Sequence, residues 1–142
     1  MKRSESLAPL SRQHHQGLVV ALRLKRADPA TAVSARRAFL DFWESEGHEH
    51  FRIEKDLLLP AYARRGAHDH PAVVKVLTDH VDLRRRAADI AAMEYVDPEM
   101  LHQLGEGLER HIRHEERVLF PLIEEALPEA ELAAVLRASG HG

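Results

Sequence analysis

The stretch that decides the fold is HIRHEERVLFP, residues 111–121, because it repeats HFRIEKDLLLP, residues 50–60. Histidine, arginine, glutamate, leucine and proline coincide in the two stretches, and each equivalent pair is 61 residues apart. An internal repeat of this kind predicts two structural units of similar design.

Each copy of the repeat contains His-x-x-x-Glu, as His50 with Glu54 and as His111 with Glu115. Residues four apart lie on the same face of an α-helix. Each pair can therefore direct an imidazole and a carboxylate at one point, where a metal ion could bind. The chain has no cysteine, so any metal must be held by imidazoles and carboxylates.

The composition indicates one globular domain, residues 1–142, with 44% hydrophobic and 30% charged residues. No apolar run approaches the roughly 20 residues that cross a bilayer, and the basic N-terminus lacks the apolar stretch of a secretory signal. We therefore expect a cytoplasmic protein with no membrane partner. The net charge of -3 argues against nucleic-acid binding, which needs clustered positive charge. The 11 histidines are the feature that requires an explanation.

Helix-forming residues dominate the sequence, and proline or glycine marks the expected breaks. The pattern predicts an all-α fold, an antiparallel up-down-up-down four-helix bundle with a short C-terminal helix. The expected helices span residues 11–27, 30–65, 71–95 and 98–127, and the short tail helix spans residues 129–138. Short connections favour antiparallel neighbours.

Polar side chains interrupt the apolar stripes of the second and fourth expected helices. His50 with Glu54, and His111 with Glu115, fall among apolar residues spaced three and four apart. A carboxylate buried in apolar surroundings costs on the order of several kcal/mol unless it is paired or bound to a metal. A buried salt-bridge network is one interpretation of these pairs, and a metal centre is the other.

Two more histidines extend this symmetry to the first and third expected helices. His15 and His80 are 65 residues apart, and each is followed by leucine at plus three. His14 is a rival to His15, which we prefer because apolar residues lie at plus three, four and seven from it. Six donors from four helices exceed what one tetrahedral zinc accepts, but they suit two ions bridged by carboxylates. We expect the two ions to be iron. They would leave a coordination position open for dioxygen, peroxide, nitric oxide or water.

Other polar and aromatic residues near these positions are expected to have supporting roles. The histidines expected at the surface or behind the ligands are His48, His68, His70, His102 and His114. Glu44, Glu94 and Glu116 could add a carboxylate, although a solvated helix face is the simpler interpretation. Trp43 and Tyr62 are expected to pack rather than to relay electrons. No His-Glu-x-x-His is present, which disfavours a zinc protease.

The two repeated stretches, together with Asp79-His80, resemble the hemerythrin and HHE cation-binding family over nearly the whole chain. The hallmarks of that family are an early helix histidine and a His-x-x-x-Glu that precedes Leu-(Leu/Phe)-Pro. The resemblance implies a centre of two iron ions, bridged by carboxylates and by an oxo or hydroxo group. The metal ligands that it implies are His15, His50, His80 and His111, with Glu54 and Glu115 as bridges.

The resemblance also implies an activity, namely binding of or reaction with dioxygen, peroxide or nitric oxide, or sensing of iron or oxidative state. Oxygen-carrying hemerythrins have a fifth ligating histidine, whereas the positions four before and four after His80 are Val76 and Arg84. The ligand set is therefore more similar to the bacterial branches linked to iron sensing and stress response. The alternatives are a metal-stabilised interaction or sensor module without turnover, and a metal-free or single-metal bundle.

Overall fold

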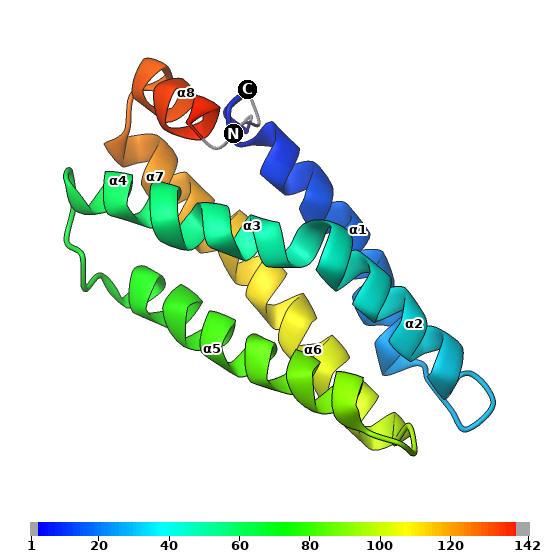
Figure 1. The fold of residues 1–142 in the computed structure, drawn as a ribbon. Helices are drawn as coiled ribbons and strands as arrows, with labels where there is room; N and C mark the ends of the chain where they lie inside the picture. The colour runs from blue at the N-terminus through cyan, green and yellow to red at the C-terminus, as the bar shows by residue number, and fades with distance from the viewer. Residues whose placement is uncertain (1–2, 139–142) are drawn as a thin grey trace.

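The computed structural model describes residues 3–138, most of which are helical and none of which lies in a strand (Figure 1). Three short segments are π-helical and are labelled η. The elements in chain order are α1 (Ala8–Lys25), α2 (Ala32–Phe42), η1 (Trp43–Gly47), α3 (His48–Ile53), η2 (Glu54–Leu58), α4 (Leu59–Ala63), α5 (Pro71–Ala92), α6 (Pro98–His114), η3 (Glu115–Leu119), α7 (Phe120–Ala126) and α8 (Glu129–Arg137).

Four long helical rods account for most of the described chain. The first is α1, the second runs without a break from α2 to α4, the third is α5, and the fourth runs from α6 to α7. Figure 1 shows α8 at the end of the bundle where the N-terminal segment also lies. The observed bounds differ from the expected ones at some ends. For example, α1 begins earlier, at Ala8, and α5 ends earlier, at Ala92. The sequence-based prediction of an all-α fold is confirmed for residues 3–138.

The starts of α5 and α6 are set by capping side chains. The ring Nδ1 of His70 accepts a hydrogen bond of 3.0 Å from the backbone N–H of Ala72. The carboxylate of Asp97 accepts one of 3.0 Å from the backbone N–H of Glu99. Proline follows each cap, where its missing N–H leaves no donor unsatisfied. These local signals fix where the third and fourth rods begin.

Two of the π turns begin at a glutamate and end two residues before a proline. The N–H of Leu59 bonds to the carbonyl of Glu54, and the N–H of Phe120 bonds to the carbonyl of Glu115, each five residues back. Proline follows directly after Leu59 and after Phe120. A proline inside a helix cannot donate a hydrogen bond, and its ring crowds the carbonyl four residues back. The wider turn accommodates the ring without ending the rod.

Small residues let α1 approach α6 closely. A Cβ atom on Gly105 of α6 would lie 2.8 Å from the carbonyl oxygen of Ala21 in α1, and a Cβ on Gly17 of α1 would lie 2.7 Å from Ile112 of α6. Both distances are shorter than ordinary contacts, so alanine does not fit at either position without movement. The close approach brings the polar side chains of the two helices together.

Two apolar clusters fill the interior, one toward each end of the bundle. Leu58, Leu119 and Ile123 belong to the cluster nearer α8. Leu24 and Leu104 belong to the cluster at the other end. Most of the stability of such a bundle comes from burial of these apolar faces. Among residues 3–138, no helix has both the length and the apolar character of a bilayer-spanning segment.

Candidate metal centre

Within residues 3–138, six polar side chains are buried, and all six lie together between the two apolar clusters. Their exposed fractions run from 0% for Glu54 and Glu115 to 5% for His14. The six are His14 in α1, His50 in α3, Glu54 in η2, His80 in α5, His111 in α6 and Glu115 in η3. Each of the four rods therefore contributes at least one histidine to a single polar layer.

Glu54 divides its two carboxylate oxygens between histidines of different rods. Its Oε2 lies 3.0 Å from Nε2 of His50, four residues earlier on the same rod. Its Oε1 lies 3.0 Å from Nε2 of His80 on α5. One carboxylate thus reaches two separate imidazoles, one with each oxygen.

Glu115 makes the corresponding contacts from the fourth rod. Its Oε1 lies 2.8 Å from Nε2 of His14, 3.4 Å from Nε2 of His111 and 3.6 Å from Nε2 of His50. Its Oε2 is buried and has no hydrogen-bond partner. All four histidines therefore turn Nε2 toward the two carboxylates.

Three of the four histidines are held from behind through the other ring nitrogen. Each Nδ1 of these three lies within hydrogen-bond distance of a side-chain oxygen, which favours the proton on Nδ1 and leaves the Nε2 lone pair facing inward. The distances are 2.6 Å for His14 with Glu116, 2.8 Å for His50 with Gln13 and 3.0 Å for His111 with Asp79.

His80 is held by packing instead. Its Nδ1 is buried without a hydrogen-bond partner. Its ring stacks on Phe51, with centroids 3.9 Å apart and planes inclined by 9°. Phe51 also meets Trp43 edge-on, with centroids 5.2 Å apart. Trp43 therefore supports the ring that supports His80, and this agrees with its expected packing role.

The inward-facing atoms form two groups of four that share both carboxylates. Within each group the ligand atoms lie no more than 4.8 Å from one another. One group is His14, His50, Glu54 and Glu115, and the other is Glu54, His80, His111 and Glu115. The arrangement has the donors for two neighbouring cations, with two histidines on each side.

The distances within the cluster fit a metal ion. Two ligands at right angles on an ion with bonds of about 2.1 Å lie about 3 Å apart. The Nε2 atoms of His14 and His50 are 3.1 Å apart, close to that value. Nε2 of His111 and Oε2 of Glu115 are buried without a hydrogen-bond partner, as atoms that bind a cation would be. Imidazole and carboxylate donors together suit iron, manganese or zinc.

Without a metal, the cluster balances its charge by holding protons. Burial alone would lower the pKa of His50, but attraction and hydrogen bonding from Glu54 and Glu115 outweigh it and raise this pKa to about 10. Burial also opposes protonation of His111, whereas Glu115 and Asp79 raise its pKa to about 10. Burial would raise the pKa of Glu115, yet the neighbouring histidines hold it well below its usual range. A bound cation would take the place of these protons.

The sequence-based preference for His15 over His14 is wrong as to which side chain enters the cluster. His14 is 5% exposed and lies in the cluster, whereas His15 is exposed. Val19, part of the stripe that favoured His15, is itself 48% exposed. The buried stripe of α1 instead contains Gly17 and Ala21, which face α6. The other five residues expected at the site lie within the cluster, and their role as metal ligands stays a prediction.

Some of the residues that flank the cluster make capping or backbone contacts, and others contact the cluster histidines. His70 caps α5, and the rings of His102 and His114 donate to the backbone carbonyls of Ala27 and Ala72. Glu116 was expected to be a solvated charge, but its carboxylate contacts His14. Gln13 and Asp79 were not expected as partners of the cluster histidines, although Asp79 directly precedes His80.

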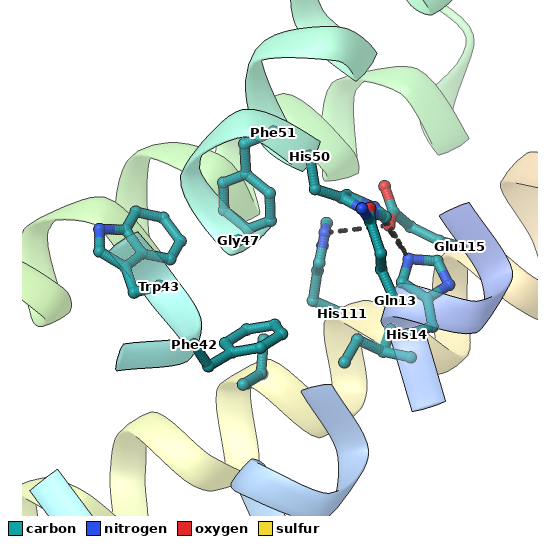
Figure 2. A pocket seen from close by; sticks show the side chains of 11 residues that line it. Gln13, His14, Phe42, Trp43, Gly47, His50, Phe51, His111 and Glu115 are labelled. Atoms are coloured by element: carbon teal, nitrogen blue, oxygen red, sulfur yellow. Dashed lines mark hydrogen bonds and ion pairs between the residues drawn. The ribbon is translucent and has the colours of Figure 1, made fainter. Parts of the chain in front are cut away.

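A small cavity of about 20 Å³ lies beside the cluster (Figure 2). His14, His50, His111 and Glu115 form its polar wall. Its apolar lining includes Phe42, Trp43, Phe51 and Ile112. The volume accommodates roughly one water-sized molecule. A ligand that reached the cluster through this cavity would have to be very small.

The helical bundle and its buried layer of histidines and glutamates, which could hold a metal ion, are the features of a cation-binding protein. The Hemerythrin HHE cation binding domain matches residues 7–123, and the chain belongs to the hemerythrin family. The match confirms the family that the sequence motifs indicated. No curated protein and no solved structure matches the chain significantly.

Proposed function

We propose that this chain binds two iron ions in neighbouring positions that share Glu54 and Glu115. The observation that supports this most directly is the pair of four-residue groups with both carboxylates in common. His14 and His50 would complete one position, and His80 and His111 the other. Each glutamate would bridge the ions. The family match supports a cation site, and the nitrogen and oxygen donors support iron.

The residues around the ions would orient the ligands and limit what reaches them. The acceptors on Nδ1 keep three of the imidazoles in the tautomer that presents Nε2 inward. The cavity beside His111 has an apolar lining and admits only a small molecule. Bound iron would supply an open coordination position and a change of oxidation state. We infer that dioxygen, peroxide or nitric oxide binds or reacts there, or that the site senses iron or oxidative state in a stress response.

The proposal includes the arrangement of the rods and the cellular setting. Connections of only a few residues join successive rods, which favours an up-down-up-down bundle of antiparallel neighbours. We also propose that the whole chain is one domain that acts in the cytoplasm without nucleic-acid partners.

An anaerobic titration with ferrous iron tests the proposal. About two irons per chain are expected. Glu54→Ala and Glu115→Ala should each abolish paired binding while helix content, measured by circular dichroism, stays largely intact. Glu125→Ala is the matched control because Glu125 is exposed on the same rod as Glu115. Two irons bound by both bridging variants would refute the assignment of the bridges.

Exposure of the iron-loaded protein to dioxygen, peroxide and nitric oxide then tests reactivity by absorption spectroscopy. A change in the spectrum with at least one of the three ligands is expected. Two bound irons with no spectral response, together with a higher unfolding temperature, would instead favour the metal-stabilised module.

A further inference from the structure

The three oxygens behind the ligand histidines are anchored in different ways. Gln13 is neutral and lies next to His14 in α1. Asp79 is paired with Lys75, four residues earlier on the same helix, at 3.1 Å. Glu116 is paired with Arg3, which precedes the first helix. Of these three contacts, the one through Glu116 connects a ligand to the N-terminal segment.

Glu116 makes several contacts at once. Its Oε2 lies 2.6 Å from Nδ1 of His14 and accepts a hydrogen bond of 2.8 Å from the hydroxyl of Ser11. Its Oε1 lies 3.4 Å from a guanidinium nitrogen of Arg3, and the same nitrogen donates to the backbone carbonyl of Glu116 at 2.8 Å. Glu116 follows Glu115 directly in η3. One turn of helix therefore supplies a candidate bridge and the anchor of a ligand from another rod.

The N-terminal segment, residues 3–6, is docked across the end of the bundle by polar contacts. Arg3 donates to Glu124 of α7 at 2.7 Å, and its guanidinium lies 5.4 Å from the ring centre of Phe120. The backbone N–H of Ser4 donates to the other oxygen of Glu124 at 2.6 Å. The side chains of Arg3, Glu116 and Glu124 that make these contacts are only partly exposed, at 23%, 31% and 12%, but the contacts are polar and lie at the edge of the bundle, so the segment can be released at lower cost than a buried helix.

We propose that Glu116 is a positioning residue that couples docking of residues 3–6 to the metal position formed by His14 and His50. The inference rests on the proposed two-metal function. Arg3 holds the carboxylate, the carboxylate orients the ring of His14, and the ring presents Nε2 to the cation. Loss of such an outer partner commonly lowers metal affinity about 10- to 100-fold.

The coupling acts in both directions because binding linkage is reciprocal. If docking of residues 3–6 strengthens binding at this position by a given factor, metal binding strengthens docking by the same factor. His80 and His111 have no contact with this segment in the hydrogen bonds and ion pairs of residues 3–138. The position that they form shares Glu54 and Glu115 with the first position but has no histidine that is anchored to the segment.

The test measures the two stepwise affinities for ferrous iron under anaerobic conditions, by competition with a coloured chelator. Glu116→Gln should weaken one step about 10- to 100-fold and leave the other within about threefold. Arg3→Ala, which lies outside the helices, should weaken the same step by a smaller factor. His14→Ala identifies that step because it removes the ligand. Glu125→Gln is the control, with both steps unchanged.

A second readout follows docking directly. The assay is trypsin cleavage after Arg3, measured by intact mass and normalised to cleavage after Arg64. Cleavage should be slower in the iron-loaded wild-type protein than in the metal-free one. In Glu116→Gln the cleavage rate should no longer depend on iron. Equal weakening of both steps, or unchanged affinities in both Glu116→Gln and Arg3→Ala, would overturn the coupling. Fewer than two irons in the wild-type protein would overturn the proposed function and the coupling together.

Discussion

Replacement of Gly105 by alanine should force α1 away from α6, whereas the same replacement at Gly107 should not. A Cβ on Gly105 would lie 2.8 Å from the carbonyl oxygen of Ala21 and 2.9 Å from Cβ of Leu24. A Cβ on Gly107 would meet only a methyl group of Leu83, at 3.6 Å, which is ordinary contact. The two glycines lie in one helix and differ mainly in what they face.

The expected magnitudes follow from two opposing effects. Alanine is favoured over glycine inside a helix by about 1 kcal/mol, and this gain applies at both positions. Overpacking costs about 1 to 3 kcal/mol, and it applies only at Gly105, where a backbone oxygen cannot rotate aside. Gly107→Ala should therefore stabilise the protein by about 1 kcal/mol. Gly105→Ala should be less stable than Gly107→Ala by about 1 to 3 kcal/mol.

Urea unfolding of the metal-free variants measures this difference, and iron titration measures its effect on the site. Because α1 carries His14 and α6 carries His111, the widened spacing in Gly105→Ala should also weaken iron binding. Iron binding by Gly107→Ala should match that of the wild type. A Gly105→Ala protein as stable as Gly107→Ala, with unchanged iron affinity, would refute the argument that close approach of these helices builds the site.

Two further predictions concern the histidines. His14→Ala should reduce iron loading to about one ion per chain. His15→Ala should keep the wild-type loading, because the side chain of His15 is exposed. The reverse result would favour His15 as the ligand. In the metal-free protein the pKa values of His50 and His111 rise from 6.5 to about 10 on folding. Their contribution to stability is therefore complete below pH 6.5 and is lost as the pH rises toward 10. Urea unfolding at a series of pH values should show this decline, and a free energy of unfolding that increases over the same interval would contradict it.

The parts of the site that depend on spacing within one helix were predictable from the sequence. His50 with Glu54, and His111 with Glu115, are four residues apart, so a helix places each pair together however the rods pack. All four lie in the cluster. The same motifs indicated the family, which the match over residues 7–123 confirms.

The choice between His14 and His15 depended on packing between helices. Adjacent residues point about 100° apart on a helix, so only one of the two can face the interior. Apolar periodicity selected the wrong one because Val19 and Leu22, which favoured His15, are exposed, whereas the buried face of α1 includes the small residues Gly17 and Ala21. Close approach of two helices favours small residues, and a pattern of large apolar residues gives them little weight.

The side-chain oxygens that contact Nδ1 of the cluster histidines could not be predicted from the sequence either. Asp79 meets His111 from another rod, so the contact depends on how far one rod is shifted along the other. The contact of Glu116 with His14 also joins two rods, so it depends on the same relative shift. The π turns were missed because the rods continue through them, so the overall helical pattern is not interrupted.

The π turns allow each carboxylate-bearing rod to keep a straight column of buried side chains. His50, Glu54, Leu58 and Tyr62 stand at four-residue intervals, and none is more than 4% exposed. In a regular α-helix such a column drifts sideways by about 40° per step and would soon reach the surface. The additional residue taken into η2 absorbs that drift, and η3 does the same for the column through Glu115. Deleting one residue from either turn would rotate the helix beyond it, so that the cluster residues and the apolar residues near α8 could no longer face the interior together.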